Sequence, residues 1–134
     1  MSKINDYAKF VDSTTSRESK DFLAFIDSTS KLEAQEDWIN VPRVLTSAIG
    51  MLAESGEFTE VLKKMIFQGK PLNDDQRFHM KRELGDILWY WIQGCMALGY
   101  TPDEVMDENI KKLEARYPNG FEVARSETRE IGDI

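Results

Sequence analysis

The sequence predicts an all-α protein, with about four helices packed in a bundle and joined by short connections. Apolar residues recur at helical spacing through residues 42–68 and 75–98. No stretch of useful length alternates apolar and polar residues as a strand would. At 134 residues we expect one domain, with an N-terminal arm over 1–17, a helical core over 18–117 and a C-terminal tail over 118–134.

The composition is ordinary for a soluble globular protein, with 41% hydrophobic and 31% charged residues. A net charge of −7 argues against nucleic acid as a partner but not against a nucleotide, because a bound metal would invert the local field. The most apolar run, Ile87–Leu98, is too short to span a bilayer. The first residues form no apolar signal segment, and the single cysteine, Cys95, fits core packing. We therefore expect a cytoplasmic protein with no membrane partner.

The first third of the chain carries weaker helix signals than the rest. The arm is polar, with a short helical turn expected around Tyr7, Phe10 and Val11. A helix with a partial apolar stripe is expected over 18–35, followed by a loop over 36–41. Trp38 in this loop is either a core residue or a flat surface against which a nucleobase could stack.

Two long helices form the centre of the prediction. Pro42 suits the first position of a helix that runs to residue 68. Gly50 and Gly56 are poor helix residues, so something is expected to approach the backbone closely there. The next helix, 75–98, ends at Gly99 and is apolar on nearly every face from residue 87 onward. A helix apolar on every face is buried on every face, which suggests the centre of an oligomer.

The last strong helix begins at Thr101-Pro102-Asp103-Glu104, a capping box with proline at the first position. It is expected to reach residue 116 and to carry Asn109, Lys112 and Arg116 along one stripe. Cations near a helix C-terminus are favourable simply through the helix dipole. Alternatively, these side chains form a clamp for phosphate oxygens.

Two acidic pairs stand out within the long helices. Glu54 and Glu57 belong to one, and Glu83 and Asp86 to the other, each with i, i+3 spacing on one helix face. Other acidic pairs occur in the chain, but these two lie among apolar residues, where unpaired charges are costly. Either a hard cation such as Mg²⁺ neutralises them, or they form salt-bridged or solvated faces.

The single histidine, His79, lies one turn before Glu83. It is a possible further metal ligand. Next to Lys81 and Arg82, however, we favour a polar surface histidine.

The motifs together resemble the MazG-like nucleoside triphosphate pyrophosphohydrolases, members of the all-α NTP pyrophosphatase superfamily. The resemblance covers residues 42–121 and rests on three segments in order, which are Gly50–Glu60, Glu83–Tyr90 and Asn109–Pro118. The first two segments contain the ExxE and ExxD motifs of that superfamily. The length of the chain is similar to that of the small single-domain phage or bacterial members.

The resemblance implies a Mg²⁺-dependent hydrolase, with Mn²⁺ as a possible substitute. Glu54, Glu57, Glu83 and Asp86 would hold the metal, and Glu54 or Glu57 would assist a water in attacking the α-phosphorus. A nucleoside triphosphate would yield a monophosphate and pyrophosphate. Our own hypothesis is an enzyme that is either broad in its substrates or prefers deoxynucleotides. Asn109, Lys112 and Arg116 would bind phosphate oxygens, with the sugar as an alternative partner of Asn109. Tyr90 and Trp38 would either contact the sugar or base or pack in the core. The resemblance also implies a homodimer or a homotetramer arranged as a dimer of dimers.

Three alternatives stay open. A di-iron carboxylate bundle needs Glu-x-x-His motifs that the chain lacks. A non-catalytic helical interaction module would use the acidic stripe as a partner surface and would not depend on Mg²⁺. A dUTP/dCTP- or phosphoribosyl-ATP-specific pyrophosphatase would keep the fold and change the substrate.

Overall fold

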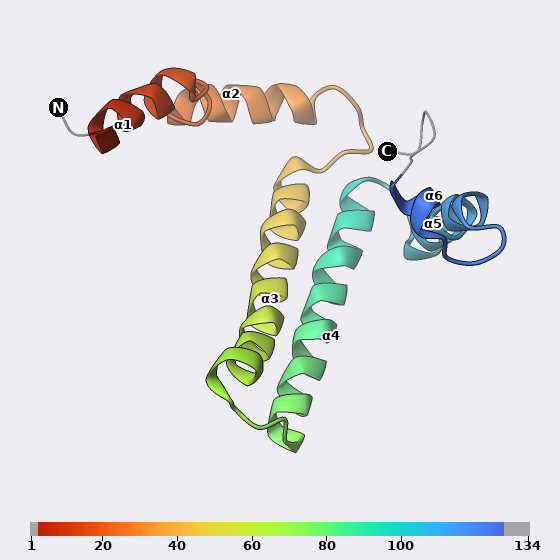
Figure 1. Ribbon diagram of the computed structural model, residues 1–134. Coiled ribbons are helices and arrows are strands. Elements are labelled where there is room, and N and C mark those ends of the chain that lie inside the picture. The colour runs from red at the N-terminus through yellow and green to blue at the C-terminus, as the bar shows by residue number, and fades with distance from the viewer. Residues whose placement is uncertain (1–2, 128–134) are drawn as a thin grey trace. The chain divides into compact units, whose positions relative to one another are not determined.

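The structure is a computed structural model that describes residues 3–127, and the described residues form helices without a strand (Figure 1). The all-α prediction is confirmed. The helices are α1 (Lys3–Thr14), α2 (Phe22–Glu33), α3 (Val41–Gln68), α4 (Asp74–Ala97), α5 (Pro102–Arg116) and α6 (Val123–Glu127). None of the described helices is long and apolar enough to cross a membrane.

The chain divides into two compact units, one up to residue 41 and one from residue 42 onward, which we describe separately. In the first unit, α1 is longer than the single turn expected of the arm. Asp21 caps α2, because its carboxylate accepts hydrogen bonds from the backbone N–H groups of Leu23 and Ala24. Trp38 follows α2 in the connecting loop and is 55% exposed.

In the second unit, α3 and α4 run antiparallel and side by side (Figure 1). Gly69, at a φ of 65°, follows the last residue of α3 in the connection to α4. Asn73 then caps α4 by accepting a 2.9 Å hydrogen bond from the backbone N–H of Gln76. This hairpin agrees with the two long helices predicted from the sequence.

Small residues let α3 and α4 approach each other. A Cβ atom at Gly50 would lie 2.2 Å from the ring of Tyr90, and one at Gly94 would lie 2.6 Å from the hydroxyl of Ser47. Nothing lies within 4 Å of a Cβ atom at Gly56. The expected close approach therefore exists at Gly50, where the partner is α4, and not at Gly56.

α5 begins with the predicted capping box. The Thr101 hydroxyl accepts the backbone N–H of Glu104, whose carboxylate accepts the backbone N–H of Thr101 at 2.7 Å. α5 contacts α4 and lies beside its C-terminal end in Figure 1. α6 falls in the tail, and Arg125 on it donates a 3.5 Å hydrogen bond to the backbone carbonyl of Arg116.

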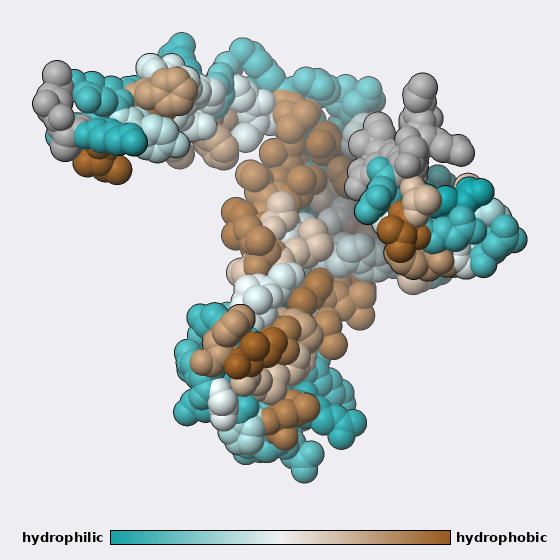
Figure 2. All heavy atoms as spheres, in the orientation of Figure 1, coloured by the Kyte–Doolittle hydropathy of each residue, from teal (hydrophilic) through white to brown (hydrophobic). Residues whose placement is uncertain are grey.

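Much apolar surface of the α3–α4 hairpin is exposed, as the brown side chains in Figure 2 show. Leu52 is 77% exposed and Trp89 53%. Among the described residues the buried hydrophobic side chains are Val41, Val61, Cys95 and Ala97. The burial of Cys95 agrees with the core position expected for it, whereas the oligomer expected around residues 87–98 stays a prediction.

Candidate metal centre

The hairpin brings acidic side chains of α3 and α4 to one place. Glu54 lies one turn beyond Gly50, so the close contact between Gly50 and Tyr90 sets the distance between the helices near it. Carboxylate oxygens of Glu54, Glu83 and Asp86 lie within 4.8 Å of one another. The two pairs singled out in the sequence therefore meet across the hairpin.

Glu83 is the centre of this arrangement. It is 6% exposed, and the other buried polar residue in the described part of the chain is Ser47. Glu83 also belongs to a second group, in which ligand atoms of Glu57, His79 and Glu83 lie within 4.8 Å of one another. The four carboxylates thus form two overlapping groups that share Glu83, rather than one set around a single point.

His79 contacts this centre directly. Its Nε2 atom lies 2.8 Å from Oε1 of Glu83, and its side chain is 49% exposed while that of Glu83 is 8% exposed. The interpretation of His79 as a surface histidine described its exposure but missed this contact. The signal was present in the sequence, because residues four apart on a helix share a face.

The electrostatics of Glu54 reflect this crowding. Desolvation raises the pKa of the Glu54 carboxyl above its ordinary value of 4.5. A hydrogen bond with Glu83 acts in the same direction, and so does repulsion from the neighbouring carboxylates. The neighbouring carboxylates of this cluster therefore repel one another, and a positive charge among them would be favourable.

These residues fit a hard divalent cation. Three carboxylates offer the oxygen ligands that Mg²⁺ and Mn²⁺ prefer. A cation among them would replace the repulsion that raises the pKa of Glu54 with attraction. The donor set and its electrostatics therefore point to the same kind of ligand.

The predicted substrate residues lie in different places. The ring of Tyr90 packs over Gly50 and meets Trp89 edge to face, with ring centroids 4.9 Å apart, so Tyr90 has a packing role between the helices. Trp38 lies in the first unit. Neither position tests a contact with sugar or base.

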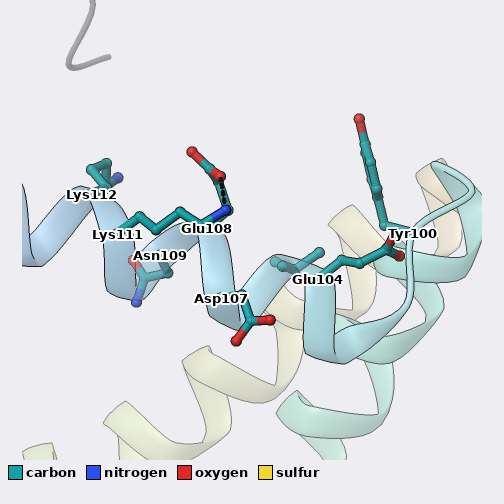
Figure 3. Close-up of a pocket in the computed structure, with 8 residues that line it drawn as sticks. Tyr100, Glu104, Asp107, Glu108, Asn109, Lys111 and Lys112 are labelled. Carbon is teal, nitrogen blue, oxygen red and sulfur yellow. Dashed lines mark ion pairs between the residues drawn. The ribbon is translucent and has the colours of Figure 1, made fainter.

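Asn109 and Lys112 line a hollow along α5 (Figure 3). Arg116 lies at the end of the same helix, with its guanidinium 5.9 Å from the ring centroid of Tyr117. The hollow also contains acidic residues, and Lys111 pairs with Glu108 at 3.7 Å. These neighbours give the hollow a mixed charge.

The hollow and the acidic centre are well separated within one chain. From Glu83 to the end of α4 at Ala97 the helix rises about 20 Å, at roughly 1.5 Å per residue. α5 begins beyond that end and lies beside it instead of returning along α4 (Figure 1).

The fold and the site define an all-α protein with a carboxylate cluster on two paired helices. The family model of the MazG nucleotide pyrophosphohydrolase domain matches residues 42–121, and the chain belongs to this family. The resemblance predicted from the motifs is confirmed. The matched residues lie within the second unit of the structure.

The chain is also similar to a curated phage protein, Gene 37 protein of Mycobacterium phage L5. The two are 29% identical over 73 residues, which cover 54% of this chain and 64% of the phage protein. The match therefore spans less than two thirds of the relative's length. No solved structure matches the chain.

Proposed function

We propose that the protein is a metal-dependent hydrolase that cleaves a nucleoside triphosphate to the monophosphate and pyrophosphate, preferring deoxynucleotides. The observation that carries the proposal is the convergence of Glu54, Glu83 and Asp86 within 4.8 Å across two helices of a MazG nucleotide pyrophosphohydrolase domain. Mg²⁺ is the proposed ion, with Mn²⁺ as a substitute, and Glu57 completes the set of residues that hold it. When bound, the metal supplies a Lewis acid that stabilises charge on phosphate oxygens.

One of the chain's own carboxylates accepts the proton of the attacking water. Glu54 is half-buried within the group that it forms with Glu83 and Asp86, whereas Glu57 is exposed and lies outside that group. We therefore assign Glu57 as the base. The water oxygen bonds to the α-phosphorus, its proton passes to Glu57, and the bond from the α-phosphorus to the bridging oxygen breaks, releasing pyrophosphate.

The binding of the triphosphate requires cations near the acidic centre. Asn109, Lys112 and Arg116 are the proposed partners of the phosphate oxygens, and Tyr90 and Trp38 of the sugar or base. Because α5 lies about 20 Å from Glu83 along α4, we propose that these α5 side chains complete a site on a second copy, in a homodimer or homotetramer. The exposed apolar residues of the hairpin, such as Leu52 and Trp89, support such an assembly.

Pyrophosphate release from eight NTPs and dNTPs, with Mg²⁺ and with EDTA, tests the proposal. We expect metal-dependent release from a subset of the panel. Glu83→Gln should reduce turnover by more than the roughly 10–100-fold that follows loss of a residue behind a metal ligand. Glu60→Gln is the matched control on α3, because Glu60 pairs with Lys63 and Lys64 outside both ligand groups. It should retain near-normal turnover.

The outcomes separate the alternatives. Release from dUTP and dCTP alone would identify a pyrimidine-specific enzyme, and phosphoribosyl-ATP belongs in a second panel for the same reason. Full turnover by Glu83→Gln would overturn the proposed site. No release from any nucleotide, with unchanged partner binding by Glu54→Gln, would favour a helical interaction module.

A further inference from the structure

Glu83 combines two properties that are unfavourable together unless neighbouring groups stabilise its carboxylate. It is buried, and it carries a carboxylate that faces other carboxylates. A buried charge is strongly unfavourable when its partner is removed. His79 can donate a hydrogen to this carboxylate, because its Nε2 atom lies 2.8 Å from Oε1 of Glu83.

We propose that His79 is a positioning residue for the metal centre, an inference that rests on the proposed function. The His79 imidazole donates its Nε2–H to Oε1 of Glu83 and so fixes the orientation of that carboxylate. A carboxylate oxygen of Glu83 lies within 4.8 Å of carboxylate oxygens of Glu54 and Asp86, so the orientation of Glu83 bears directly on that group. Hydrogen bonds of this kind behind a metal ligand orient it and strengthen metal binding.

The geometry distinguishes this role from that of an ordinary helix surface pair. Exposed pairs four residues apart, such as Asp27 and Lys31, contribute little because water screens both partners. In the pair of His79 and Glu83 the histidine is half exposed but the acid is 8% exposed. The hydrogen bond therefore acts on a group that water solvates poorly, and losing it leaves Glu83 less well oriented.

Metal binding without substrate tests the proposal directly. Mn²⁺ affinity is measured from the electron paramagnetic resonance signal of the free ion, and Mg²⁺ affinity by titration calorimetry. His79→Leu removes the donor and should weaken binding about 10–100-fold. His79→Gln keeps an N–H donor at the same helix position, so it should recover most of the affinity.

Two controls accompany these variants. Lys81→Leu makes a comparable apolar change two residues away and removes a full charge, yet it should shift affinity less than about threefold because that charge is screened. In a Glu83→Gln background, His79→Leu should have little further effect, because the oriented carboxylate is already gone. Far-ultraviolet circular dichroism establishes that each variant is folded.

Several results would overturn the assignment. Equal affinities for wild type, His79→Leu and His79→Gln would show that the hydrogen bond does not act on the metal. Equal losses in both variants, with a change in the visible spectrum of bound Co²⁺, would make His79 a direct ligand. If the wild type binds no metal, this inference and the proposed function both fail. If the wild type binds metal and releases pyrophosphate while His79→Leu binds normally, this inference alone fails.

Discussion

The Ser47 hydroxyl donates a 2.7 Å hydrogen bond to the backbone carbonyl of Tyr90. This bond joins the N-terminal part of α3 to the backbone of α4, and Ser47 itself is 2% exposed. The hydroxyl fits there because Gly94 has no side chain. The Ser47–Tyr90 hydrogen bond therefore depends on the absence of a Cβ atom at Gly94.

Gly94→Ala should lower the free energy of unfolding by about 1–3 kcal/mol, because its Cβ atom would lie 2.6 Å from the Ser47 hydroxyl oxygen. Urea denaturation followed by circular dichroism measures the change. Gly85→Ala is the control on the same helix, where nothing lies within 4 Å of the new Cβ atom. It should stabilise α4 by up to about 1 kcal/mol. Equal effects of the two substitutions would contradict the packing described here.

A second pair of glycines makes the same comparison on α3. Gly50→Ala would place a Cβ atom 2.2 Å from the Tyr90 ring, so we expect a loss of about 1–3 kcal/mol in unfolding free energy. Gly56→Ala meets no neighbour and should instead gain up to about 1 kcal/mol in helix propensity. Thermal melting of both variants, read at the same protein concentration, distinguishes the two signs. Destabilisation by Gly56→Ala would indicate a contact at that face.

In the metal-free protein, the contribution of Glu54 to stability should be lost as the pH rises above about 4.5. The pKa of Glu54 is raised above this ordinary value in the folded state, so the folded protein holds the proton longer than the unfolded chain does. The stabilising contribution is complete below the unfolded pKa and is lost as pH rises through the folded one. Urea midpoints in EDTA across this range measure the slope, and Glu54→Gln should flatten it. Saturating Mg²⁺ should restore the stability lost at neutral pH.

Glu60, on the same helix, should contribute to stability with the opposite pH dependence. Its ion pairs with Lys63 and Lys64 lower the pKa of the Glu60 carboxyl. Its contribution is therefore present above the unfolded pKa and is lost as pH falls through the folded one. Glu60→Gln should not raise the free energy of unfolding at neutral pH. A rise equal to that caused by Glu54→Gln would contradict the assigned cause.

The capping box at the start of α5 gives a fifth prediction. Thr101→Ala should cost about 0.5–2 kcal/mol, because the backbone N–H of Glu104 loses its acceptor. The loss of helicity on heating measures the effect, and Thr101→Ser, which keeps a hydroxyl, should change it little. Hydrogen bonds from Thr101 also lower the pKa of the Glu104 carboxyl, so this end of α5 should weaken as pH falls through that pKa.

The helices were predictable because their signals are local. Caps, proline positions and apolar spacing indicated α3, α4 and α5 to within a residue or two. The i, i+3 spacing likewise identified both acidic pairs. The length of α1 was underestimated because the arm was interpreted from Tyr7, Phe10 and Val11 alone. Ile4 extends the same apolar face toward the start of the helix, which runs to Thr14.

The distribution of the carboxylates between two groups was not predictable from the sequence. Glu57 lies with His79 and Glu83, whereas Glu54 lies with Glu83 and Asp86. Which side chains meet depends on the rotation of α3 against α4, and that rotation is set by contacts far along the chain. The close approach at Gly50 was predicted, but its partner, Tyr90, could not be named because it follows Gly50 by 40 residues.

The glycine contacts between α3 and α4 have a consequence for the register of the hairpin. Gly50 against Tyr90 and Ser47 against Gly94 fix two points along an antiparallel pair, so neither helix can slide without a clash. A slip of one residue would rotate the α4 side chains by about 100° relative to α3. Glu83 and Asp86 would then face away from Glu54. The two glycines, which have no side chain at the helix interface, thus fix the register that brings the carboxylates together more than a turn away.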